Sequence, residues 1–138
     1  MTLLSAISMY FTMFLMVDKT SNAYNNMNTF YMTFAMVSIM VFIEFLFMRS
    51  MYPDTKINMA IISLSIILLI ISVTFTRKQV GIGNTQFLRS MIPHHAGALL
   101  MCDNNNITDL EIKQLCENIK TSQQTEIDWM KTKLKRLK

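Results

Sequence analysis

The sequence predicts an all-α protein in which three transmembrane helices precede an antiparallel helical hairpin. Only 3 glycines and 2 prolines occur in 138 residues, which leaves little room for strands joined by turns. Six of the 22 charged residues (13 basic, 9 acidic) precede Arg77. Because the first 76 residues hold three runs with little or no charge, a soluble single-core domain is excluded. We expect a transmembrane region at 1–76, a linker at 77–84 and a helical domain at 85–138.

Three apolar runs carry the predicted spans, namely 1–17, 27–48 and 57–75. About 20 helical residues cross a hydrocarbon core of roughly 30 Å, so the second and third runs are long enough and the first is at the lower limit. Arg49 and Lys56 in the second loop, against Lys19 in the first, favour a cytoplasmic N-terminus and an outward C-terminal domain. The basic residues after the third run favour the reverse, which leaves the orientation open.

Methionine is in large excess, with 14 residues, and it recurs along the spans. Met32, Met36 and Met40 lie within about 80° of one another on a helix, and Glu44 continues the four-residue spacing. Thioethers bind Cu(I), and an ionisable group inside a span is a functional candidate. Methionine also fills gaps between helices, and Glu44 lies near the membrane interface. The sequence alone favours this packing interpretation.

A turn at 103–106 separates two amphipathic helices in the C-terminal domain. Apolar residues of the first repeat at helical spacing: Phe87, Leu88, Met91, Ala98 and Cys102. The second begins at a capping box, Thr108 to Glu111, and its stripe is about 100° wide: Ile112, Leu115, Cys116, Ile119, Gln123, Glu126, Met130, Leu134 and Leu137. The short connection makes the two helices antiparallel neighbours, and they bury so little surface that we expect a four-helix bundle formed by oligomerisation.

His94 and His95, the two histidines, straddle the inner face of the first helix, one turn after Met91. Imidazole beside thioether favours copper, especially Cu(I). The alternative is a polar core layer in which the histidines bond to Glu126 and Gln123. If the helices pair about residue 105 or 106, Glu126 lies a turn or two from the histidines, unless the helices slide or another subunit meets it.

Residues 87–98 (FLRSMIPHHAGA), followed by Met101 and by 123–130 (QQTEIDWM), resemble the bacterial domain-of-unknown-function 305 family. The resemblance covers 85–137 and implies a ferritin-like helical fold, copper binding outside the cytoplasm and, by similarity to short membrane-bound members, a periplasmic domain on the bacterial inner membrane. It implies metal ligands on the first helix and ligands or supporting groups on the second: Met91, His94, His95, Met101, Glu126 and Met130.

Cys102 departs from the family pattern, which often has a small apolar residue at that position. Cys102 and Cys116 can add a thiolate ligand, form a disulfide in an oxidising periplasm, or remain two buried thiols. Of these alternatives we favour the two unpaired, buried thiols.

These features predict a membrane-anchored protein that holds or passes Cu(I), for sequestration, tolerance or transfer, and that catalyses no reaction. Its expected partners are membrane lipids, further copies of itself and a copper transporter. The alternative is an interaction protein whose hairpin oligomerises or docks on a transporter without metal. A metal-dependent oxidase is disfavoured because the paired Glu-x-x-His set of di-iron bundles is absent, and a membrane-spanning chain is not expected to bind nucleic acid.

The basic tail at 131–138 is expected to face water and to complement the helix dipole. The alternative is that it binds anionic lipid headgroups.

Overall fold

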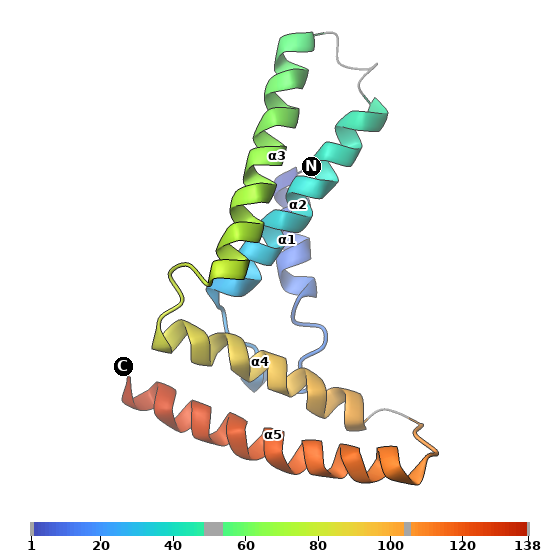
Figure 1. Ribbon diagram of the computed structural model, residues 1–138, viewed down its shortest axis with the longest axis vertical. Coiled ribbons are helices and arrows are strands. Elements are labelled where there is room, and N and C mark those ends of the chain that lie inside the picture. Colours follow the sequence, from blue (N-terminus) through green and yellow to red (C-terminus); the bar gives the residue numbers. More distant parts are fainter. Residues whose placement is uncertain (1, 49–53, 104–105, 138) are drawn as a thin grey trace. The chain divides into compact units, whose positions relative to one another are not determined.

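The computed structural model describes residues 2–48, 54–103 and 106–137, and these ranges contain helices and no strand, which confirms the all-α class (Figure 1). The elements in chain order are α1 (Thr2–Thr12), the short 3₁₀ helix η1 (Thr20–Asn22), α2 (Met27–Met48), α3 (Thr55–Lys78), α4 (Asn84–Asp103) and α5 (Leu110–Arg136). The chain divides into two compact units. The first consists of Met1–Met13 and Asn28–Gly81, and the second of Phe14–Met27 and Ile82–Lys138.

Two helices of the first unit, α2 with 22 residues and α3 with 24, are long and apolar enough to cross a membrane. At a rise of 1.5 Å per residue they extend for about 33 and 36 Å. The carboxylate of Asp54 begins α3 by accepting hydrogen bonds from the backbone N–H groups of Lys56 and Ile57, at 2.9 and 3.2 Å. Three hydroxyls buried on α2 and α3, those of Thr33, Ser38 and Ser65, donate to backbone carbonyls of the preceding turn.

The start of α2 and the end of α3 are tied to each other. The side-chain amides of Asn28 and Gln79 exchange two hydrogen bonds of 3.1 Å, and the Tyr31 hydroxyl donates to the Val80 carbonyl at 2.8 Å. The ring of Tyr31 also meets that of Phe75 edge to face, with centroids 5.5 Å apart. These contacts hold α2 and α3 as an antiparallel pair.

The prediction of a third span at 1–17 is wrong. α1 has 11 residues, about 16 Å of helix, against a hydrocarbon core of roughly 30 Å. From Phe14 onward the chain belongs to the second unit, where Val17 and Tyr24 pack against the core of the hairpin. Val17, the last residue of this run, therefore contacts protein. The boundaries 1–76, 77–84 and 85–138 remain a prediction from the sequence.

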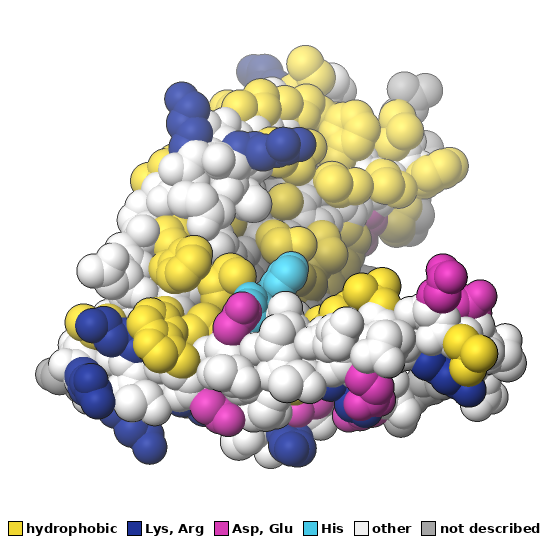
Figure 2. All heavy atoms as spheres, turned by 60° about the horizontal axis from the view of Figure 1, so that its bottom comes forward, with side chains coloured by type: hydrophobic (Ala, Val, Ile, Leu, Met, Phe, Trp, Pro, Cys, Tyr) yellow, Lys and Arg dark blue, Asp and Glu magenta, His cyan; other side chains and the backbone are white. Residues whose placement is uncertain are grey.

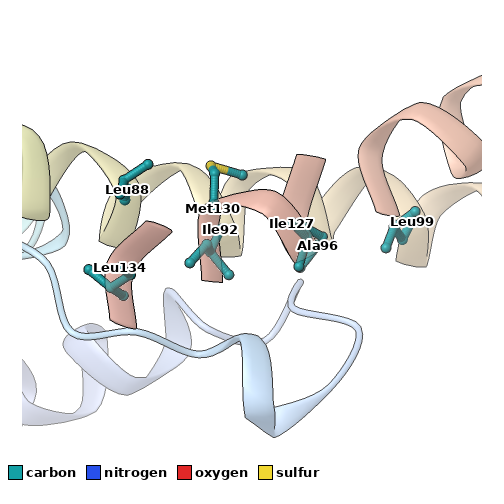
Figure 3. Packing of buried hydrophobic residues seen from close by; sticks show 7 residues of the cluster. All are labelled: Leu88, Ile92, Ala96, Leu99, Ile127, Met130 and Leu134. Carbon is teal, nitrogen blue, oxygen red and sulfur yellow. The ribbon is translucent and has the colours of Figure 1, made fainter. Parts of the chain in front are cut away.

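In the second unit α4 and α5 lie side by side and antiparallel (Figure 1), as the sequence predicts. Figure 3 shows the hydrophobic core between them, formed by Leu88, Ile92, Ala96 and Leu99 of α4 and by Ile127, Met130 and Leu134 of α5. The α4 residues follow a spacing of four, four and three, which places them on one face. Three of these residues, Ile92, Ala96 and Ile127, are completely inaccessible to solvent.

The face that α5 buries matches the predicted stripe only in part: Met130 and Leu134 are buried as expected. Ile112, Leu115 and Leu137 of the expected stripe are exposed, and Ile127, outside that stripe, is fully buried. The helix is rotated so that Ile127 enters the core while its neighbour Glu126 lies at the edge. Burying isoleucine in place of an ionised carboxylate avoids the large desolvation penalty of the charge.

The register of the hairpin also differs from the expected pairing about residue 105 or 106. Asp109, and not Thr108, begins α5: its carboxylate accepts from the N–H groups of Glu111 and Ile112, at 2.9 and 3.0 Å. Opposite the end of α4, a disulfide joins Cys102 to Cys116, whose Cα atoms are 5.3 Å apart. The favoured interpretation of two unpaired thiols is therefore wrong, and the midpoint of the hairpin shifts to about residue 110 because the connection is longer than expected.

Candidate metal site on the hairpin

His95 occupies the side of α4 that faces α5. Its side chain is 12% exposed, and its Nδ1 lies 3.0 Å from Oε2 of Glu126. Nδ1 is buried, and the carboxylate oxygen does not align with it as a hydrogen-bond acceptor. Figure 2 shows histidine beside an acidic side chain among the charged residues of the hairpin. The two side chains are therefore in close electrostatic contact but do not form a hydrogen bond.

Burial lowers the pKa of His95 below its ordinary value, because an imidazolium ion is poorly solvated there. The negative charge of Glu126 opposes this shift, and His94 adds to it. Since the side chain of Glu126 is 54% exposed, water screens much of its effect. His95 is therefore neutral at physiological pH, and a neutral imidazole offers one nitrogen lone pair to a metal.

His94 and Met91 lie on the same part of α4. His94 is exposed, and its ring centroid is 6.0 Å from that of His95, with 60° between the ring planes. Met91 precedes these residues by one turn and packs, partly buried, against the hydrophobic core. One turn of helix thus carries two imidazoles and a thioether, and the carboxylate of Glu126 on α5 contacts one of them, His95.

The structure does not bring the remaining predicted ligands equally close. Met130 is 5% exposed and is part of the core, one turn after Glu126 on α5. Met101 is 54% exposed, and its seven-residue separation from His94 places it about 10 Å further along the helix axis. In the described parts of the chain no three His, Cys, Asp or Glu side chains form a group that could hold a metal. A site here needs at least one thioether.

Three features that position the site are contacts between separate segments of the chain. The disulfide of Cys102 removes the thiolate as a ligand and fixes α4 against α5. Lys120, which reaches Asp103 at 3.1 Å across the hairpin, fixes the same end. Gly97, two residues after His95, lies where the chain before α2 crosses α4: a Cβ atom there would be 3.2 Å from the backbone oxygen of Met16. The site helix is thus covered by a segment far away in sequence.

Two comparisons connect the chain to known proteins. Residues 81–137 match the family described as domain of unknown function (DUF305). The chain is also similar to "Uncharacterized protein L153" of Acanthamoeba polyphaga mimivirus, with 36% identity over 121 residues that cover 86% of this chain and 78% of that protein. No solved structure matches. The chain therefore belongs to the DUF305 family, whose domain here comprises the helical hairpin with its paired histidines.

Proposed function

We propose that this protein is a membrane-anchored Cu(I)-binding protein that stores or passes on the metal and catalyses no reaction. The observation that carries the proposal is the position of His95, which is largely buried, neutral at physiological pH and held against the carboxylate of Glu126. A metal-bound histidine commonly directs its second nitrogen at a carboxylate, which orients the ring. Because Nδ1 lies 3.0 Å from the Glu126 carboxylate, Nε2 of His95 is the nitrogen that remains to bind metal.

The donor set fits a soft monovalent cation. His95 and His94 supply nitrogen and Met91 supplies sulfur from a single turn of α4, a combination that favours Cu(I) over hard cations. Glu126 serves as the orienting group in this arrangement. Met130 and Met101 remain predicted ligands; the smaller set is the one that the geometry supports.

The proposed location is a membrane surface facing an oxidising compartment, which for a bacterial cell is the periplasm. The two helices long enough to span a bilayer, α2 and α3, support the membrane anchor. The Cys102–Cys116 disulfide supports an oxidising environment for the hairpin, since reducing compartments keep such thiols unpaired.

A second candidate function is an interaction module without metal, and the surface of α5 favours it. Ile112, Leu115 and Trp129 are each about half exposed or more, at 49, 55 and 62%. Exposed apolar residues along one helix are typical of a surface that meets another protein or another copy of the chain. Oligomerisation through this helix is compatible with either function.

Anaerobic Cu(I) titration of the full-length chain in detergent, against a competing chelator, tests the proposal. We expect the wild type to bind one equivalent that the His94→Ala/His95→Ala variant lacks. Met91→Leu should weaken this equivalent by about tenfold or more, comparable to the loss of other groups that support a metal site. Met59→Leu removes an exposed thioether that belongs to no proposed ligand set, so it is the control and should leave this equivalent unchanged. Equal uptake by the wild type and the double histidine variant would overturn the proposal and favour the interaction module.

A further inference from the structure

A hollow in the first unit has no role in the function proposed above. Its volume is about 530 Å³, and it is lined by Ser5 of α1 and by residues of the second half of α2: Met36, Ile39, Met40, Ile43 and Glu44. A smaller hollow adjoins it along α1, shares Ser5 and is lined also by Leu4, Ser8 and Met9. The two hollows beside α1 are therefore lined by thioethers, hydroxyls and one carboxylate.

Packing between α1 and α2 creates the hollow. The rings of Tyr10 and Phe30 stack with centroids 4.6 Å apart, which fixes the end of α1 beside the start of α2. From there the two helices run in opposite directions, since Ser5 precedes Tyr10 whereas the lining residues follow Phe30. α1 has half as many residues as α2, so the hollow opens where α1 covers α2 least.

Three lining side chains repeat every four residues on α2. Met36, Met40 and Glu44 are each half-buried toward the hollow, which places two sulfur atoms and a carboxylate along one face of the helix. Met32, which begins the same series, does not line the hollow and is 44% exposed. The four-residue spacing relates four residues of α2, and three of these four line the hollow.

The chemistry of this set matches one class of ligand. Two thioethers prefer a soft monovalent cation such as Cu(I), and a carboxylate neutralises its charge within an apolar segment. Hard cations such as Ca²⁺ require six or more oxygen ligands, which a lining dominated by methionine and isoleucine does not offer.

We propose that this hollow is a second Cu(I) site, located within the candidate membrane spans, with Met36 and Met40 as thioether ligands and Glu44 as the anionic ligand. The proposal is independent of the hairpin site, because none of its residues belongs to the second unit.

The test uses the full-length His94→Ala/His95→Ala variant in detergent, so that the hairpin site is absent. Under anaerobic conditions, with Cu(I) added against a competing chelator, we expect this variant to retain one tight equivalent. Adding Met36→Leu and Met40→Leu should remove it, and adding Glu44→Gln should weaken it by about tenfold. Leucine has nearly the volume of methionine, so these replacements preserve packing. X-ray absorption of the retained copper should show sulfur neighbours and no imidazole.

Two matched controls separate this site from general methionine binding. Met32→Leu on α2 and Met59→Leu on α3 each remove one exposed thioether. Both should leave the retained equivalent unchanged. If the double histidine variant binds no Cu(I), or if the control pair lowers affinity as much as the Met36 and Met40 replacements, the second site does not exist. Neither result bears on the hairpin site, which the wild-type comparison tests.

Discussion

His95 of α4 and Glu126 of α5 meet across the hairpin, with 3.0 Å between Nδ1 and Oε2. The imidazole is largely buried while the carboxylate is half exposed, so burial and charge act on His95 in opposite directions. Because burial has the larger effect, the pKa of His95 lies below its ordinary value. The balance between these two effects is the property that the first two predictions test.

Replacing Glu126 with glutamine should lower the pKa of His95 further. Glu126 raises this pKa through its negative charge, and the amide keeps the shape of the side chain without the charge. The measurement is a pH titration of the His95 ring by NMR. Asp128→Asn is the matched control, since Asp128 lies on α5 and accepts a hydrogen bond from Gln124. A pKa that rises or stays constant in Glu126→Gln contradicts the electrostatic role of Glu126.

The hairpin should lose stability as the pH falls below about 6.5. The folded-state pKa of His95 lies below its ordinary value of 6.5, so in this range the unfolded chain binds more protons than the folded one. Stability then increases with pH toward neutrality and decreases under acid conditions. Hydrogen exchange of α4 amides at pH 5 and pH 7.5, corrected for intrinsic exchange rates, measures the effect.

The His95→Gln variant should lose part of this acid sensitivity, whereas His94→Gln, at the exposed neighbouring position, should keep it. If His95→Gln shows the same loss of protection at acid pH as the wild type, another group is responsible.

Reduction of the Cys102–Cys116 disulfide should destabilise the hairpin by about 3 kcal/mol. The bond closes a loop with a sequence separation of 14, and a loop of roughly this length contributes about that much by restricting the unfolded chain. Chemical denaturation followed by circular dichroism, with and without a reductant, measures the difference. The Cys102→Ser/Cys116→Ser variant serves as the control and should not respond to the reductant. A wild type that is equally stable with both thiols reduced would rule out this contribution.

Ile127→Ala should cost about 2–5 kcal/mol of unfolding free energy, because the side chain is completely buried between α4 and α5. Leu115→Ala is the matched comparison on the same helix. Its side chain is 55% exposed, so its loss should cost well under half as much. The pair distinguishes the face that is buried from the stripe expected by periodicity, which contains Leu115 and excludes Ile127. A larger effect at Leu115 would favour the expected stripe.

Local patterns in the sequence are sufficient to predict most of the helices. The uncharged runs predict α2 and α3, and the apolar spacing with the flanking turn predicts α4 and α5, because each signal depends on residues within one helix. The same local argument places Met91, His94 and His95 on one helical turn. These parts of the fold and of the candidate site need no knowledge of distant contacts.

Features that depend on contacts between distant segments could not be predicted in this way. Val17 at the end of the first run packs against the hairpin core, and nothing in the sequence distinguishes this contact from contact with lipid. Rotating α5 by one residue exchanges Glu126 for Ile127 in the core, a change too small for a stripe about 100° wide to resolve. The connection between α4 and α5 sets their register, and with it the contact of His95 with Glu126.

The second unit is built from two pieces of chain, Phe14–Met27 and Ile82–Lys138, that are separated by both candidate spans. During synthesis the first piece leaves the ribosome long before the surface that it covers has been made. Val17 and Tyr24 can therefore pack only after α4 and α5 have been synthesised. If α2 and α3 cross a bilayer, the two pieces meet only when both spans are inserted and both ends emerge on one side. Folding of the hairpin would then be coupled to membrane topology, and an isolated fragment that begins at residue 82 lacks part of its own covering.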